Sequence, residues 1–130
     1  MARFKNSIRF KMGRKIKLRA SDSLSTYEVT AMLVEGEEIL SSYIAVRDYV
    51  VFTNKRVIAV DVRGVVGKKK NYTSIPYANV QVFSVETAGL GDPDSELDIW
   101  VAGVGHIHFD FTSKTNIAAI GKSISECMLV

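Results

Sequence analysis

Short runs of apolar residues alternate with polar turn residues along most of the chain. The clearest case is Asp48–Val60, where the apolar runs Tyr49–Phe52 and Val57–Val60 flank Thr53-Asn54-Lys55-Arg56. Asn tolerates a left-handed backbone better than most residues, so Asn54-Lys55 can close a two-residue hairpin. The β-branched and aromatic residues on either side suit a pleated, half-buried surface. The pattern therefore predicts two antiparallel strands here, within a larger antiparallel meander.

The same pattern predicts seven short strands, followed by one helix. The expected strands are Ile39–Arg47, Tyr49–Thr53, Arg56–Val62, Asn71–Ile75, Val80–Thr87, Glu96–Val101 and His106–Phe111. Residues 26–33 are expected to form a short helix or turn. Near the end of the chain, apolar residues recur at the spacing of one helical face, namely Ile117, Ile120, Ile124, Cys127 and Met128. Many short strands and one terminal amphipathic helix predict a small antiparallel barrel or sandwich capped by that helix.

The register of the last predicted hairpin follows from its apolar faces. The apolar residues of both strands must lie on the same side of the sheet, because a one-residue slip would move one set to solvent. A three-residue loop at Gly103–Gly105 satisfies this condition and pairs Ala102 with His106. Gly105 would then supply the left-handed position that such a loop needs.

Composition is that of one globular domain. The chain has 130 residues, of which 47% are hydrophobic, enough for one core. The single cysteine, Cys127, excludes an intrachain disulfide. No stretch approaches the roughly 18 apolar residues of a membrane span, and no apolar segment of a secretory signal follows the basic N-terminus. We therefore expect a cytoplasmic protein.

Charge divides the chain into a basic arm, residues 1–25, and a domain, residues 26–130. Residues 1–20 hold eight of the 17 Lys and Arg residues and none of the 14 acidic residues, so the rest of the chain has a net negative charge. Apolar and basic residues alternate within the arm, which favours one or two strands. Phe4, Ile8, Met12 and Ile16 also form a narrow helical stripe, which leaves a helix as the alternative.

Several segments of the domain resemble the bacterial pleckstrin-homology (PH) domain family. In order along the chain they are LVEGEEI (33–39), RDYVVFTNKRVIAVD (47–61), GKKKNYTSIPY (67–77), FSVETAG (83–89), ELDIWVAG (96–103) and FDFTSKTNIAAIGKSIS (109–125). The resemblance covers about residues 33–125 and does not include the basic arm. It implies a seven-stranded PH-like barrel capped by a C-terminal helix. It also implies assembly into a homo-oligomer, in a family whose function is otherwise largely undefined.

The name of the family suggests lipid binding, which the sequence supports only in part. Lipid-binding PH domains use basic residues in the loop between their first two strands, and the short Arg47-Asp48 junction leaves no room for such a loop here. Other cations could still bind an anionic membrane surface or ligand. This candidate set comprises Arg9, Lys11, Arg14, Lys15, Lys17, Lys68, Lys69 and Lys70. For the three consecutive lysines, the competing interpretation is a solvated loop.

Two further groups of residues have a candidate role on the polar face of the last strands. His106, His108 and Asp110 share one strand face, and Asp98 and Glu96 could lie beside them. This is a geometrically feasible metal site, but without a stronger zinc signature we interpret it as an outward polar face and assign no metal.

Trp100 also faces outward, although it is large and aromatic. Aromatic residues are enriched at interfaces, so we expect Trp100 to be covered by the arm, by the loop near Ala88 or by another subunit, and take it as a candidate interface residue.

These observations favour a non-enzymatic PH-like interaction or scaffold module that self-associates. The alternative is a peripheral binder of an anionic membrane surface or ligand, acting through the arm and Lys68–Lys70. No catalytic motif is recognised, so no catalytic residue, cofactor or small-molecule substrate is assigned. Nucleic acid is not an expected partner, because no groove-reading motif accompanies the basic residues.

Overall fold

The computed structural model describes residues 27–45, 48–64, 69–91, 94–112 and 114–129, together with the backbone of two short strands in the arm. The strands are β1 (Ser7–Arg9), β2 (Arg19–Ala20), β3 (Ile39–Ala45), β4 (Asp48–Thr53), β5 (Arg56–Arg63), β6 (Lys69–Pro76), β7 (Val80–Glu86), β8 (Ser95–Val101) and β9 (Gly105–Phe111). The helices are α1 (Tyr27–Thr30), the 3-10 helix η3 (Tyr77–Asn79) and α2 (Ile117–Met128). None of these helices is long and apolar enough to cross a lipid bilayer.

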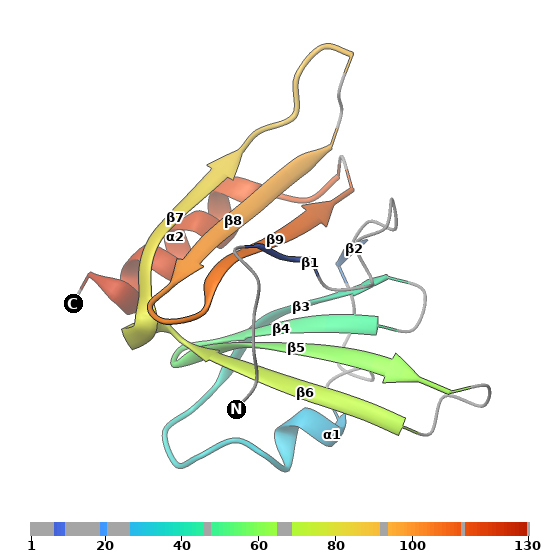
Figure 1. The fold of residues 1–130 in the computed structure, drawn as a ribbon, viewed down its shortest axis with the longest axis vertical. Helices are drawn as coiled ribbons and strands as arrows, with labels where there is room; N and C mark the ends of the chain where they lie inside the picture. Colours follow the sequence, from blue (N-terminus) through green and yellow to red (C-terminus); the bar gives the residue numbers. More distant parts are fainter. Residues whose placement is uncertain are drawn as a thin grey trace.

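Two sheets form the body of the molecule, as Figure 1 shows. One has the strand order β1-β9-β8-β7 and the other the order β2-β3-β4-β5-β6. Helix α2 packs against β7, β8 and η3 and so closes one side of the structure. The predicted PH-like arrangement of seven antiparallel strands with a C-terminal helix is thereby confirmed, with β3 to β9 as the seven strands.

The basic arm contributes one short strand to each sheet. Strand β1 pairs in parallel with β9, so that Arg9 lies beside His108 in the register. Strand β2 pairs antiparallel with β3. The remaining residues of the arm lie outside the described residues.

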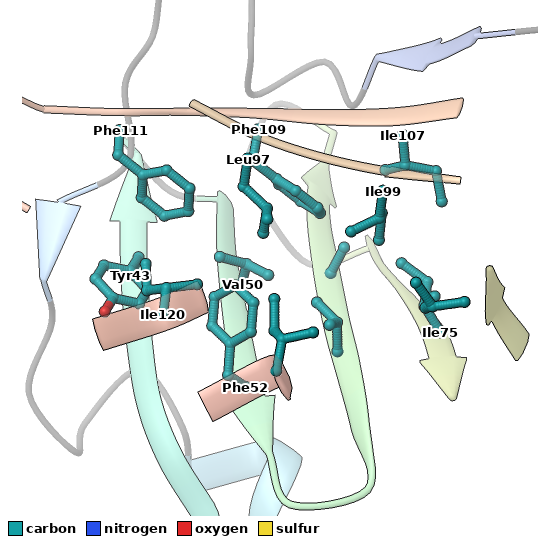
Figure 2. Packing of buried hydrophobic residues seen from close by; sticks show 14 of the residues in the cluster. Tyr43, Val50, Phe52, Ile75, Leu97, Ile99, Ile107, Phe109, Phe111 and Ile120 are labelled. Carbon is teal, nitrogen blue, oxygen red and sulfur yellow. The ribbon is translucent and has the colours of Figure 1, made fainter. Parts of the chain in front are cut away.

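The main core fills the space between the two sheets. Phe52 and Val50 on β4 and Tyr43 on β3 face Leu97, Phe109 and Phe111 from the other sheet, and Ile120 of α2 joins them (Figure 2). The ring of Tyr43 meets those of Phe52 and Phe111 edge-on, at centroid distances of 5.8 and 5.2 Å. Edge-to-face aromatic contacts are favourable beyond the area they bury, so they add specificity to this core.

A second, smaller core lies on the outer face of the five-stranded sheet. There the single-turn helix α1 places the fully buried Val29 against Tyr49, Val51, Ile58 and Val60. This cover explains why β4 and β5 are apolar on both faces rather than alternating, which is the pattern of a strand buried on both sides. The short helix expected within residues 26–33 is therefore part of the fold.

The hairpin of the Thr53-Asn54-Lys55-Arg56 motif forms as the sequence predicts. Phe52 pairs with Val57, and β4 ends at Thr53 while β5 begins at Arg56, which leaves Asn54-Lys55 as the loop. The preceding junction is also short, because Ala45 at the end of β3 pairs with Asp48 at the start of β4. Val46 and Arg47 lie outside the described residues.

The last hairpin corrects the predicted register. Its apolar faces align as expected, but Val101 pairs with Gly105 and Trp100 with His106, so the loop is Ala102–Val104. Gly103 adopts a φ of 76° in this loop, and the Val104 N–H donates to the Val101 carbonyl oxygen at 3.0 Å. Side chains repeat every two residues along a strand, so registers two apart bury the same face. The face criterion could not separate them.

Candidate functional site

Five polar residues gather on the outer face of the four-stranded sheet. They are Glu96 and Asp98 on β8, and His106, His108 and Asp110 on β9. We call them the histidine–carboxylate cluster. The register pairs Asp98 with His108 and Glu96 with Asp110. They face outward because the alternating residues Leu97, Ile99, Ile107 and Phe109 fill the core.

The contacts within the cluster converge on His108 and Asp98. One oxygen of Asp98, Oδ1, lies 2.7 Å from His108 Nδ1 and 2.5 Å from His106 Nε2. The other ring nitrogen of His108, Nε2, lies 2.8 Å from Asp110 Oδ1 and 3.3 Å from Glu96 Oε1. His108 is only 7% exposed. The structure therefore brings together all five residues that the sequence placed on this face, and makes His108 their centre.

The pKa values of two residues of this cluster, His108 and Glu96, are shifted by their surroundings. Burial opposes protonation of His108, but the hydrogen bonds with Asp98 and Asp110 outweigh it, and the pKa of the imidazole is raised. Burial raises the pKa of Glu96, with His108 acting in the opposite direction and Asp110 adding to the rise. Both shifts favour the protonated form of the group concerned.

An apolar patch adjoins the cluster. Val82 on β7 pairs with Trp100 on β8, which pairs with His106 on β9. Val82 is 55% exposed and Trp100 is 37% exposed; we call these two residues the Val82–Trp100 patch. The indole of Trp100 stacks on the imidazole of His106, with ring centroids 4.8 Å apart and planes 18° apart. The outward orientation predicted for Trp100 is confirmed, and its role at an interface stays a prediction.

The candidate anion-binding residues divide between the two sheets where they are described. Arg9 lies in β1 of the four-stranded sheet, whereas Lys69 and Lys70 begin β6 of the other. These two lysines extend the ladder opposite Arg63 and Val62, so they belong to a strand and not to the predicted loop. Lys70 forms an ion pair with Glu28 of α1. Lys11, Arg14, Lys15, Lys17 and Lys68 lie outside the described residues.

A buried ion pair, which sequence reasoning missed, explains part of the hairpin motif. Arg56 donates from Nε to Glu37 Oε2 at 2.8 Å and from Nη2 to Glu37 Oε1 at 2.9 Å. Thr53 Oγ1 and the Val34 N–H donate to the same carboxylate, at 2.7 and 3.1 Å. We call Glu37 and Arg56 the Glu37–Arg56 clamp. The sequence places Arg56 at the start of a predicted strand, and nothing local in it links this arginine to an acid 19 positions earlier.

Asn54 ties the same turn to the hairpin. Its side-chain oxygen accepts from the Glu38 N–H at 2.8 Å, and its side-chain nitrogen donates to the Gly36 carbonyl oxygen at 3.0 Å. The segments 35–38 and 53–56 therefore form one hydrogen-bonded unit. These contacts give the family-like residues of both segments a structural role.

Comparison with known proteins identifies the family. The model of the bacterial PH domain family matches residues 9–128. The chain belongs to this family. The match extends beyond the resemblance at residues 33–125 into the arm, where it covers β2 and the last residue of β1, Arg9.

Solved structures and sequence relatives agree with this assignment. A DUF1696 family protein with a pleckstrin-homology domain from Shewanella loihica PV-4 superimposes with a TM-score of 0.76 at 33% identity, covering 86% of this chain and 97% of that one. A pleckstrin homology domain from Shewanella amazonensis SB2B gives 0.63 at 40% identity, covering 81% and 86%.

Two sequence relatives are the uncharacterized proteins YjqA and YozO of Bacillus subtilis strain 168. YjqA is 51% identical over 76 residues and YozO 40% identical over 77, or 58% and 59% of this chain. The matched region spans 61% of YjqA and 67% of YozO. The names of these two relatives state no ligand or partner.

Proposed function

We propose that this bacterial PH domain is a non-enzymatic interaction module that self-associates through the β7 side of its four-stranded sheet. The observation that carries the proposal is the Val82–Trp100 patch, which lies on β7, at one end of that sheet, and on the neighbouring strand β8. A second copy of the chain is the occupant we propose for this surface, because one surface can then supply both sides of the contact.

The position of β7 supports this proposal. It is the terminal strand of its sheet in the part of the chain that the structure describes. A terminal strand presents backbone N–H and C=O groups that another strand can pair with. Its inner face is occupied, because Phe83 and Val85 pack against the main core and α2 lies against β7. Its outer face carries Val82, so a partner would gain backbone pairing and apolar burial at the same place.

Burial of apolar surface is the expected source of binding energy at the Val82–Trp100 patch. Removing apolar surface from water contributes about 25 cal/mol per Å², and a large aromatic residue at the centre of an interface often contributes most of the binding energy. Trp100 lies beside Val82 and next to charged residues. The patch therefore has the anatomy of an interface centre with a polar rim.

The experiment measures the mass of the native particle by light scattering coupled to size exclusion, over a wide range of protein concentrations. We expect an oligomer for the natural chain and a shift towards the monomer for Val82→Lys. Val34→Lys is the matched control, since Val34 is 57% exposed against 55% for Val82 and lies elsewhere. A natural chain that stays monomeric, or a Val82→Lys variant that assembles normally, would refute the proposal.

The anionic-surface alternative has weaker support. Of the cations near the start of β6, Lys70 is paired with Glu28, and Arg63 Nε lies 2.8 Å from Asp61 Oδ2. Flotation with phosphatidylserine vesicles tests it, and charge reversal at Lys11 and Lys15 is a better variant than deletion. Deleting residues 1–20 would also remove β1 and β2 from the sheets. Salt-sensitive binding that charge reversal abolishes would favour this alternative.

A further inference from the structure

The histidine–carboxylate cluster has a feature that neither self-association nor the family assignment explains. Both ring nitrogens of His108 face carboxylate oxygens, Asp98 Oδ1 at 2.7 Å and Asp110 Oδ1 at 2.8 Å. A neutral imidazole carries one N–H, so it can donate to one of them and must face the other with a lone pair. Two acceptors that face each other repel, unless a proton or a metal ion lies between them.

We propose that a divalent transition-metal ion, Zn²⁺ in particular, binds in this cluster. The ligands are His106 Nε2, His108 Nδ1 and the carboxylate of Asp98, which the structure already brings within 4.8 Å of one another. Two imidazoles and a carboxylate form a donor set that suits zinc, while Mg²⁺ and Ca²⁺ prefer oxygen ligands alone.

The carboxylates behind His108 fit this assignment. A histidine that binds a metal through one nitrogen usually donates its other N–H to a carboxylate, which fixes the tautomer and the ring orientation. Asp110 is placed to accept from His108 Nε2, with Glu96 Oε1 at 3.3 Å from the same nitrogen. This leaves the lone pair of Nδ1 directed towards Asp98 and His106, where the ion would lie.

The ligand spacing requires a small adjustment. Zinc bonds of about 2.0–2.2 Å in a tetrahedral arrangement place neighbouring ligand atoms about 3.3 Å apart. The present contacts of Asp98 Oδ1 with the two imidazoles are 2.5 and 2.7 Å, so these side chains must separate by less than about 1 Å. Asp98 and His106 are both partly exposed, so they can move and a water molecule can complete the coordination. A dication would also offset the charge of the three carboxylates around the imidazoles.

The chain offers a favourable background for the test. It contains two histidines, both in this cluster, and one tryptophan, Trp100, which stacks on His106. Metal binding at His106 should therefore change the fluorescence of Trp100. Titration of tag-free protein with ZnCl₂ near neutral pH, followed by calorimetry and by this fluorescence, is expected to show one bound ion per chain. MgCl₂ and CaCl₂ serve as controls, and neither should reproduce the fluorescence change.

Variants assign the ligands. We expect His106→Gln and His108→Gln to abolish saturable binding, and Asp110→Asn to weaken it by about 10–100-fold. Asp61→Asn is the matched control, because that carboxylate pairs with Arg63 in the other sheet. Unchanged zinc affinity in both histidine variants would overturn the proposal.

A measurement on the natural chain covers the case in which a histidine variant does not fold. Imidazole ¹⁵N NMR spectra distinguish metal-bound, protonated and neutral nitrogens in each ring. Zinc should shift His106 Nε2 and His108 Nδ1, leaving a proton on His108 Nε2. Spectra that show a doubly protonated His108 which excess ZnCl₂ does not alter would mean that a proton fills this position, and the metal site would be refuted.

Discussion

Replacing Glu37 by Gln removes the charge of the Glu37–Arg56 clamp while keeping the size of the side chain. The Glu37 side chain is fully buried and that of Arg56 is 19% exposed. Removing one partner of a buried ion pair leaves the other uncompensated and costs about 3–5 kcal/mol. Because Arg56 keeps some contact with water and a hydrogen bond to the Met32 carbonyl oxygen at 2.9 Å, we expect a loss near the lower limit, about 3 kcal/mol.

The lowered pKa of Glu37, which has the same contact as its main cause, corresponds to a stabilisation of similar size. The hydrogen bonds from Arg56 lower the pKa from 4.5 to about 2, against the opposing effect of burial and with help from Thr53 and Val34. This lowering of the pKa corresponds to about 3 kcal/mol, because a pKa difference of one corresponds to about 1.4 kcal/mol. The folded-state pKa is depressed, so the stabilisation is fully present above about pH 5 and is lost as the pH falls towards 2.

Urea denaturation at several pH values measures this effect. Near pH 7 the variant should be less stable than the natural chain by about 3 kcal/mol, and the difference should shrink steadily below about pH 4. Glu35→Gln is the control, because Glu35 lies exposed in the same turn, and its effect should stay within about 0.5 kcal/mol. A Glu37→Gln variant as stable as the natural chain, or a difference that does not change with pH, would contradict the reasoning.

Three further substitutions test other parts of the fold. Asn54→Ala removes two hydrogen bonds between the hairpin and the preceding turn, and should cost about 1–3 kcal/mol in urea denaturation; no loss would show that water replaces them. Gly121→Ala should raise the melting temperature, because alanine is favoured over glycine by about 0.5–1 kcal/mol within a helix. The added Cβ would meet Val85 at 3.4 Å, an ordinary contact distance. A lower melting temperature would mean that this contact is too tight. Leu97→Ala should cost about 2–5 kcal/mol, because Leu97 is fully buried between the sheets; a loss under about 1 kcal/mol would mean that the core closes over the gap.

The sequence predicted which residues form the histidine–carboxylate cluster, but not how their side chains contact one another. Strict alternation in β8 and β9 was enough to place Glu96, Asp98, His106, His108 and Asp110 on one face. It could not show that His108 has a carboxylate at each ring nitrogen, because that depends on the register, and two registers two residues apart bury the same apolar face.

The Glu37–Arg56 clamp shows another limit of sequence reasoning. A charged residue in a turn is normally solvated, and an arginine after a tight hairpin normally points to water. Whether the two meet is decided by the path of the chain between them. That path includes β3 and β4, which bring the turn and the hairpin to the same end of the sheet.

By itself, the sequence determined the order of the seven main strands and the terminal helix, the two-residue loop at Asn54-Lys55 and the inward faces of β8 and β9. These follow from local backbone preferences and from the two-residue period of a strand, which act over a few neighbours. The tertiary structure decided which polar groups meet: Glu37 with Arg56, Lys70 with Glu28, and His108 with its two aspartates. Such contacts join residues on different elements, and their energy depends on burial and distance, which exist only once the two sheets have packed.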